Sequence, residues 1–189
     1  MFQLTESQRQ LLLQIARDAV RSYLAGELRR LPEFTSGVLA ESHGIFVSIH
    51  KGQDLRGCIG NVNPVGPLWR SAAECAIAAA VGDLRFTPIT LPELSLVEFE
   101  ISVLSAVEQV QSVNEIEVGV HGLLVSKGGS RGLLLPQVAT TYGWDRERFL
   151  QETCKKAGLK SDDWKDGATI YRFRALVFGE KAFHFTTNS

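Results

Sequence analysis

Segments that alternate apolar and polar residues occur along this chain in closely spaced pairs, and this arrangement constrains the fold most. Residues 44–54 read "GIFVSIHKGQD", and residues 53–64 read as the hairpin partner, with "KGQD" near the turn. Residues 121–136 contain a second such pair on either side of the Gly128-Gly129 dipeptide. Alternation with a period of two is typical of a half-buried strand, and short glycine-containing links join strands into hairpins. The sequence therefore predicts a mainly antiparallel sheet.

Three further segments have the pattern or composition of helices. Residues 5–8 form a capping box, with Thr5 as the cap and Gln8 three positions later, ahead of apolar residues at helical spacing. An alanine-rich stretch follows Pro67, and Asp145 precedes a third segment that ends in lysines and a glycine. We expect a helix in each of these places.

The remaining segments complete an α+β pattern. Residues 97–110 and 169–180 alternate like strands, and residues 83–94 read as a loop punctuated by prolines. Hairpins mixed with helices, without regular strand–helix–strand alternation, predict an α+β fold with a mainly antiparallel sheet. We treat residues 1–189 as a single domain, because composition marks no linker or repeat.

Composition excludes several classes of function. A net charge of −1 and a pI of about 6.4 argue against broad nucleic-acid binding. No apolar stretch approaches the roughly 18 residues of a membrane span, and the N-terminus lacks a signal-peptide pattern. Three widely spaced cysteines, Cys58, Cys75 and Cys154, fit free thiols in the reducing cytoplasm. No zinc-ligand spacing is present, so we expect no metal or other cofactor.

The stretch "QDLRGCIGNVNP" contains Cys58, the cysteine whose role the sequence leaves most open. Because side chains on a strand alternate faces, Arg56 and Cys58 are predicted to share one face. Leu55, Gly57 and Ile59 share the other face, where the two apolar residues would join the core. A glycine between them would let another helix or strand approach closely. Cys75 and Cys154 lie within predicted helices, where we expect them to be core residues.

The register of the hairpin decides what Cys58 faces, because a slip of one residue exchanges the two faces. A connection with an odd number of residues places Cys58 opposite Ser48 and Arg56 opposite His50. A connection with an even number pairs Cys58 with Val47 and makes it a core residue. The apolar pattern favours the odd connection.

Cys58 and Arg56 each have two interpretations. With a cation and an imidazole nearby, Cys58 would be a candidate nucleophile, because the thiolate is the reactive form of cysteine. Alternatively it is a small buried hydrophobe, as most free cysteines are. Arg56 is a candidate clamp for a carboxylate or phosphate ligand, or the partner of a structural carboxylate.

Four other residues are candidates for the same site. His50 and His121 are candidate bases, because histidine titrates nearest to neutral pH, and either is alternatively a structural residue. Asp83 and Arg85 could bind a ligand, pair with each other, or hold their loop in place. The "SKGGSRG" segment is rich in donors but matches no phosphate-loop motif, so a plain hairpin tip is expected.

Several motifs, in this order, resemble the AMMECR domain family, which includes protein A of the AmmeMemoRadiSam system. They begin with "LRGCIG" at 55–60 and "GDLRF" at 82–86, followed by "TPIT" and "PEL". "GLLLPQVA" at 132–139, "GW", "FL" and "CKKAGL" at 154–159 come next. Together they cover nearly the whole chain. One position departs from the family pattern: Leu84 stands where the family has a proline, which loosens one restraint on the loop.

The resemblance implies an α+β fold in two unequal parts, the larger containing both chain ends. It also implies association with a Memo-like protein and with a radical S-adenosylmethionine enzyme, but it implies no reaction. It identifies the six residues Leu55–Gly60 as the candidate site. We therefore expect an accessory or binding module. The alternative is a thiol-dependent enzyme or carrier, in which Cys58 is the nucleophile and Arg56 orients a small anionic ligand.

Overall fold

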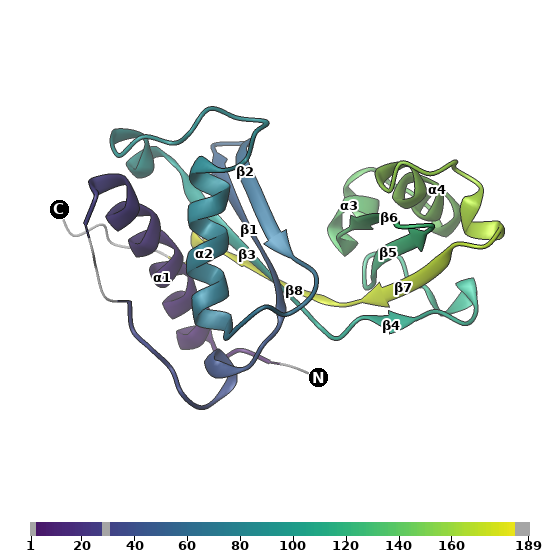
Figure 1. Ribbon diagram of the computed structural model, residues 1–189, viewed down its shortest axis with the longest axis horizontal. Helices are drawn as coiled ribbons and strands as arrows, with labels where there is room; N and C mark the ends of the chain where they lie inside the picture. The colour runs from purple at the N-terminus through teal and green to yellow at the C-terminus, as the bar shows by residue number, and fades with distance from the viewer. Residues whose placement is uncertain (1–2, 28–30, 184–189) are drawn as a thin grey trace. The chain divides into compact units, whose positions relative to one another are not determined.

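A computed structural model describes residues 3–27 and 31–183, which fold into two compact units (Figure 1). Unit 1 comprises the described residues up to Val103 together with those from Leu176 to Phe183, and unit 2 is Leu104–Ala175. Each unit contains one four-stranded sheet and two α-helices. The predicted α+β class with antiparallel strands is confirmed, but the strands form two sheets where the sequence suggested one.

Unit 1 contains two helices and a sheet with the strand order β2-β1-β3-β8. The capping box at Thr5 begins α1, and the left-handed conformation of Gly26 ends it. Pro67 immediately precedes α2, as predicted. The bounds are α1 Glu6–Ala25, β1 Gly44–Lys51, β2 Asp54–Asn61, α2 Leu68–Val81, β3 Glu98–Leu104 and β8 Ala175–Gly179.

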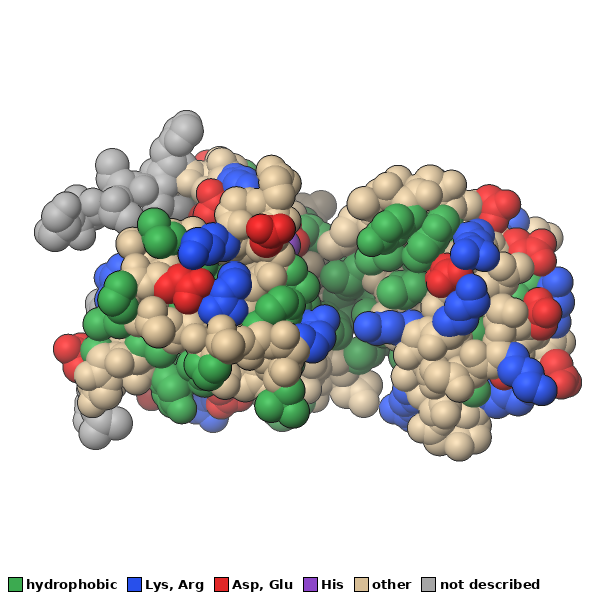
Figure 2. Space-filling view, turned by 90° about the horizontal axis from the view of Figure 1, so that it is seen from above, with side chains coloured by type: hydrophobic (Ala, Val, Ile, Leu, Met, Phe, Trp, Pro, Cys, Tyr) green, Lys and Arg blue, Asp and Glu red, His purple; other side chains and the backbone are tan. Residues whose placement is uncertain are grey.

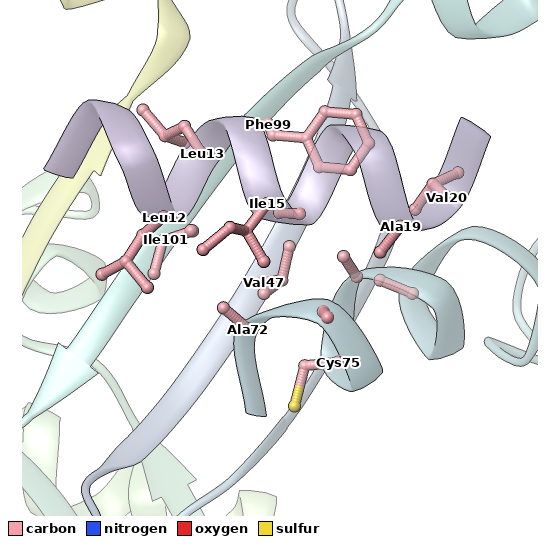
Figure 3. Close-up of a cluster of buried hydrophobic side chains, with 14 of the residues drawn as sticks. Leu12, Leu13, Ile15, Ala19, Val20, Val47, Ala72, Cys75, Phe99 and Ile101 are labelled. Atoms are coloured by element: carbon pink, nitrogen blue, oxygen red, sulfur yellow. The ribbon is translucent and has the colours of Figure 1, made fainter. Parts of the chain in front are cut away.

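The core of unit 1 lies between its helices and one face of its sheet. α1 and α2 pack against each other, and α2 contacts both β1 and β2. Figure 3 shows buried side chains of both helices meeting Val47 of β1 and two residues of β3, Phe99 and Ile101. Along β1, the buried residues alternate with half-buried ones, so one face of this strand is in the core. The alternation predicted from the sequence is confirmed here.

Unit 2 has its own hydrophobic core and a sheet with the strand order β4-β7-β5-β6. The second predicted hairpin is present, with residues 128–129 as its two-residue turn. Asp145 caps α4 by accepting a hydrogen bond from Arg148 N, as the sequence indicates. The bounds are β4 Glu108–Gln109, β5 Gly122–Lys127, β6 Ser130–Leu134, α3 Pro136–Thr141, α4 Arg146–Lys156 and β7 Thr169–Phe173.

The last predicted strand, residues 169–180, is wrong in one respect. It is two strands, β7 and β8, which belong to different sheets. Arg174 lies between these two strands and forms two hydrogen bonds with Ser105. The Ser105 backbone N–H donates to the Arg174 carbonyl, and the Ser105 Oγ accepts from the Arg174 N–H. The periodicity continues through this residue, so the pattern alone does not show the change of sheet. α3 and the short 3₁₀ turn η2 at Pro92–Leu96 are also absent from the sequence prediction.

Within the described residues, no helix combines the length and the apolar character that crossing a membrane requires.

Candidate functional site

The hairpin of β1 and β2 has the register that makes Cys58 a candidate for function. Ser48 pairs with Cys58, and Val47 pairs with Ile59. Ile59 packs against the core of unit 1, whereas Cys58 is half-buried and shares the less buried face with Ser48. The alternative register, in which Cys58 is a core residue opposite Val47, does not occur. The turn contains only residues 52 and 53, so it is not the odd-length connection that the sequence suggested.

A β-bulge at Arg56 reconciles the two-residue turn with this register. Ile49 pairs with Gly57 and His50 pairs with Leu55, so Arg56 is the extra residue in β2. The two-residue turn and the one extra residue together displace the pairs beyond the bulge by the same amount as a turn with an odd number of residues would. The predicted pairing of Arg56 with His50 is therefore wrong. The prediction that Leu55 points to the core is also wrong, because Leu55 lies on the His50 face of the hairpin.

Two glycines of β2 lie where a side chain would overlap its neighbours. A Cβ on Gly57 would collide with the carbonyl of Ala79 in α2. The sequence prediction that Gly57 permits a close approach is confirmed, and α2 is the helix that approaches. A Cβ on Gly60 would collide with the Ile45 carbonyl and the ring of Phe46. The two glycines thus let a helix and an aromatic ring contact the strand directly.

The backbone of Cys58 is held by two side chains from the loop that follows α2. β2 lies at the edge of its sheet. The Cys58 N–H donates to Asp83 Oδ2 at 2.9 Å, and Arg85 Nη2 donates to the Cys58 carbonyl at 3.2 Å. Asp83 and Arg85 therefore bind both outward backbone groups of this one residue. The "LRGCIG" and "DLRF" motifs form one connected structure.

Asp83 and Arg85 also bind each other. Arg85 Nε donates to Asp83 Oδ1 at 2.9 Å, and Arg85 Nη2 donates to Asp83 Oδ2 at 2.7 Å. The Asp83 side chain is 5% exposed and that of Arg85 is 56% exposed. The Arg85 hydrogen bonds, with help from the Cys58 N–H, hold the pKa of the Asp83 carboxyl well below its usual range despite burial. Asp83 is therefore a buried, ionised anchor beneath a largely exposed cation.

Arg56 is paired with a structural carboxylate, one of its two interpretations from the sequence. Its Nε and Nη2 donate to the two oxygens of Glu93 at 2.8 Å and 3.0 Å, and its Nη1 donates to the Thr87 carbonyl at 3.0 Å. The hydrogen bond from Arg56 lowers the pKa of Glu93, and Lys51 adds a weaker attraction. The bidentate pair ties η2 and its preceding loop to β2.

The three thiols differ in exposure. Cys58 is half-buried, and its Sγ accepts a hydrogen bond from Ser48 Oγ at 3.2 Å. Cys75 and Cys154 are buried, as the sequence predicts, and Figure 3 shows Cys75 within the core cluster. Burial raises the pKa of Cys75 to about 11, and burial is also the main cause that raises the pKa of Cys154. Only Cys58 has the exposure that a reactive thiol needs.

The two candidate bases lie in different units. His50 follows Ser48 by two positions on β1, on the face that Cys58 also shares. His121 belongs to unit 2, is 7% exposed, and its Nδ1 accepts a hydrogen bond from Glu117 N. Burial, followed by the positive charge of Arg172, lowers the pKa of His121. Unit 1 therefore brings together Cys58, Ser48 and His50 on one face of the hairpin, and His121 is not part of this set.

Three residues that contact the site were not named as site candidates from the sequence. Ser48 donates to the Cys58 thiol, Glu93 holds Arg56, and the Thr87 carbonyl completes that clamp. Ser48 has a signal in the sequence, because the favoured register places it opposite Cys58. Glu93 lies 37 positions from Arg56, and no local pattern links them.

Charge on the surface is mixed. On the face shown in Figure 2, Lys and Arg side chains are interspersed with Asp and Glu side chains in each unit. The described part of that face therefore has no broad basic patch of the kind that non-specific nucleic-acid binding uses. Among residues 3–27 and 31–183, no three His, Cys, Asp or Glu side chains are grouped so that they could hold a metal ion.

Comparison with known proteins identifies relatives that match nearly the whole chain. The sequence profile of the AMMECR1 family matches residues 13–178. A protein from Methanothermobacter thermautotrophicus is 47% identical over 177 residues, which cover 89% of this chain and 92% of that protein. A protein from Pyrococcus furiosus is 40% identical over 193 aligned positions, covering 96% of this chain and 92% of its own.

A solved structure supports the same relationship. The crystal structure of the uncharacterised protein PH0010 from Pyrococcus horikoshii matches with a TM-score of 0.89 at 38% sequence identity. The match covers 95% of each chain. The similarity therefore extends over both units and is not confined to the motifs.

Proposed function

Because the chain belongs to the AMMECR1 family, we propose that it is a partner-binding module whose docking surface is built on Leu55–Gly60 in β2. One observation carries the proposal. The charged side chains of the "LRGCIG" and "DLRF" motifs form hydrogen bonds within the chain. Arg56 bonds Glu93, and the pair of Asp83 and Arg85 bonds the backbone of Cys58. These hydrogen bonds hold the loop side chains against the strand, and a surface that is already ordered suits recognition.

The occupied guanidinium group of Arg56 argues against recognition of a small anion by this residue. A bidentate clamp needs two free N–H groups on one edge of the guanidinium. In Arg56 the Nε and Nη2 groups already bind the two oxygens of Glu93, and Nη1 binds the Thr87 carbonyl. A small anionic ligand would have to displace Glu93. Replacing one carboxylate by another gives little net binding energy, because the same hydrogen bonds are broken and remade.

The ordered strand favours binding to a protein partner. Ordering side chains and loops on association costs about 0.5–1.5 kcal/mol for each immobilised side chain, so a surface that is already ordered binds more tightly. The half-buried Cys58 and Phe46 lie on the hairpin face that the core leaves uncovered. We propose this face, together with the edge of β2, as the contact surface.

We propose a Memo-like protein and a radical S-adenosylmethionine enzyme as the partners, on the basis of the family resemblance. Association in the cytoplasm is proposed with them, because the three cysteines are free and would persist as thiols in a reducing compartment. Nucleic acid is not proposed as a partner, in view of the mixed surface charge.

The test is direct binding between purified proteins. The Memo-like and radical S-adenosylmethionine proteins encoded in the same genome are passed over the immobilised chain in surface plasmon resonance. Cys58→Ser keeps the size of the side chain, so it should bind within about twofold of the wild type. Cys58→Trp adds bulk to the proposed surface and should weaken binding more than about tenfold, which is 1.4 kcal/mol.

The matched control is Arg131→Ala, which removes an exposed side chain from the edge strand β6 of unit 2. It should bind like the wild type. If both partner proteins bind Cys58→Trp as tightly as the wild type, the proposed surface is wrong. If neither partner binds the wild-type chain, these two partners are wrong.

A thiol-dependent enzyme or carrier is the second candidate, and the environment of Cys58 favours it. Cys58 is half-buried, Ser48 Oγ donates a hydrogen bond to its Sγ, and the Arg85 guanidinium donates to its carbonyl. Of the three thiols, this one alone has the exposure that a nucleophile needs. Iodoacetamide labelling near neutral pH tests this candidate. Labelling of Cys58 no faster than that of free cysteine excludes it, and faster labelling supports it.

A further inference from the structure

His121 is a buried titratable side chain that the proposed contact surface does not use. It belongs to unit 2 and is 7% exposed. Its Nδ1 accepts a hydrogen bond from the Glu117 N–H at 3.0 Å. A backbone N–H can only donate, so this ring nitrogen carries no proton, and the neutral ring has its proton on Nε2. The folded structure therefore specifies both the charge and the tautomer of His121.

The same histidine closes the turn of residues 117–121, which precedes β5. The Glu117 carbonyl accepts the backbone N–H of His121 at 2.9 Å and that of Val120 at 3.2 Å. Both backbone groups of Glu117 are thus bonded to the far end of the turn. One of these bonds, the bond to Nδ1, needs the neutral imidazole.

We propose that this turn is a pH-sensitive switch, closed while His121 is neutral and opened when its ring binds a proton. Both nitrogens of an imidazolium carry hydrogen, so Nδ1 would face the Glu117 N–H as a second donor and the hydrogen bond would be lost. Protonation also places a charge on a buried side chain, which is costly. The closed turn therefore binds fewer protons than the open turn, and acid favours opening.

Charged groups from the turn and from neighbouring strands face the His121 ring. Burial is the largest cause that lowers its pKa, followed by the positive charges of Arg172 in β7 and of Arg174 just beyond it. Glu117 and Glu108, in the turn and in β4, act more weakly in the opposite direction. Glu108 also pairs with Arg172 at 3.4 Å. The surroundings of the ring thus favour its neutral form, in agreement with the hydrogen bond.

Contacts on either side of the turn limit how far it can open. Before the turn, the Ile116 carbonyl accepts a hydrogen bond from Arg146 Nε at 2.9 Å. The Glu115 carbonyl accepts one from Arg172 Nη1, also at 2.9 Å. After the turn, Gly122 begins β5, which has a paired strand on each side. Opening is therefore confined to the turn itself.

The closed turn covers apolar surface of unit 2. Val118 packs against the hydrophobic core of this unit. Gly119 has a φ of +85° and lies so close to α3 that an added Cβ would be 2.9 Å from Thr140 Cγ2. Opening releases both contacts. The protonated form therefore exposes apolar surface of Val118 and α3 that the neutral form covers.

NMR spectroscopy of the purified, ¹⁵N-labelled full chain tests the switch. At neutral pH the His121 ring should be the tautomer with its proton on Nε2. Exchange of the Glu117 amide is measured relative to that of an unstructured chain at the same pH. It should become about tenfold faster as the pH is lowered from about 7.5 to 4.5, the range in which histidine titrates. Its midpoint should coincide with the titration of the His121 ring.

His121→Gln is the matched variant, because a glutamine oxygen can accept the Glu117 N–H but does not titrate in this range. It should keep the Glu117 amide protected at every pH. His43→Gln changes a histidine of unit 1 and should behave like the wild type.

Three results would overturn the proposal. One is a wild-type Glu117 amide whose protection stays constant through the titration of His121. Another is a neutral His121 ring with its proton on Nδ1. The third is a pH dependence that persists unchanged in His121→Gln. The first two are measured on the wild-type chain, so they decide the matter even if the variant fails to fold.

Discussion

The backbone N–H of Cys58 donates to Asp83 Oδ2 at 2.9 Å, across 25 positions of the chain. This bond joins the signature strand to the loop after α2, and Arg85 completes the connection at the carbonyl of the same residue. A carboxylate that accepts a backbone N–H and a bidentate arginine is held strongly in its ionised form. The "LRGCIG" strand and the "DLRF" loop are thus joined by hydrogen bonds, so substitutions in the loop should change the stability of the strand.

Asp83→Asn should remove part of the acid sensitivity of the fold. The Arg85 hydrogen bonds, aided by the Cys58 N–H, place the native pKa of Asp83 well below its ordinary value of 3.8. A carboxyl whose pKa is lower in the folded than in the unfolded chain stabilises the fold above the unfolded value. This stability is lost as the pH falls below about 4 and through the native pKa.

Urea unfolding at a series of pH values between about 7 and 2.5 measures the effect, because the carboxyls titrate in this range. The variant should be less stable than the wild type at neutral pH, and the difference should shrink as the pH falls. Asp166→Asn is the matched control, because this carboxylate is 94% exposed and lies in unit 2. A difference for Asp83→Asn that stays constant over the whole pH range would contradict the assigned pKa.

Sequence patterns predict the parts of this site that lie within one hairpin, and they fail where distant segments meet. Alternation predicts the Ser48–Cys58 pairing, and a glycine between apolar positions predicts the close approach at Gly57. The bulge was missed because its extra residue, Arg56, is stabilised by Glu93, 37 positions away. A local pattern contains no information on such a contact. The family motifs indicate which segments matter, but not that one side chain binds the backbone of another.

Gly57→Ala should destabilise the fold, because its added Cβ would collide with the Ala79 carbonyl. The obstacle is backbone in the middle of a packed helix–strand contact, so a rotamer change cannot relieve it. Overpacking of this kind costs about 1–3 kcal/mol. Urea unfolding of the purified variant measures the loss. Gly66→Ala is the matched control, because a Cβ at Gly66 meets nothing within 4 Å. Equal stability of the two variants would show that α2 moves aside without cost.

One thiol should react quickly in the folded chain and three in the unfolded chain. Cys58 is half-buried, whereas Cys75 is 3% exposed and Cys154 is 0% exposed. Burial also raises the pKa of Cys75 to about 11, so little of it is thiolate at pH 8. Labelling with Ellman's reagent at that pH, followed by peptide mass analysis, checks the order. Cys58→Ser should abolish the fast phase and leave the slow phases unchanged. A fast phase that persists in this variant would contradict the burial of the other two thiols.

Arg17 and Glu180 form a largely buried ion pair away from the site, and breaking it should be costly. Arg17 Nε and Nη2 each donate to a Glu180 oxygen at 2.6 Å, and the two side chains are 13% and 7% exposed. Glu180 also accepts the N–H of Phe99, the residue whose ring lies under the Arg17 guanidinium. Glu180→Ala leaves a buried cation without its anion, which costs about 3–5 kcal/mol.

Unfolding in urea measures the loss in Glu180→Ala, and Arg148→Gln is the control. Arg148 pairs with Glu152 on the surface of α4 at 2.8 Å, and its side chain is 51% exposed. Solvent and salt screen such a pair, so this variant should lose only about 0.3–0.5 kcal/mol. The loss in Glu180→Ala should also persist in high salt, because buried pairs are screened much less than exposed ones. Losses of similar size in the two variants would mean that the Arg17–Glu180 pair contributes no more than a surface pair.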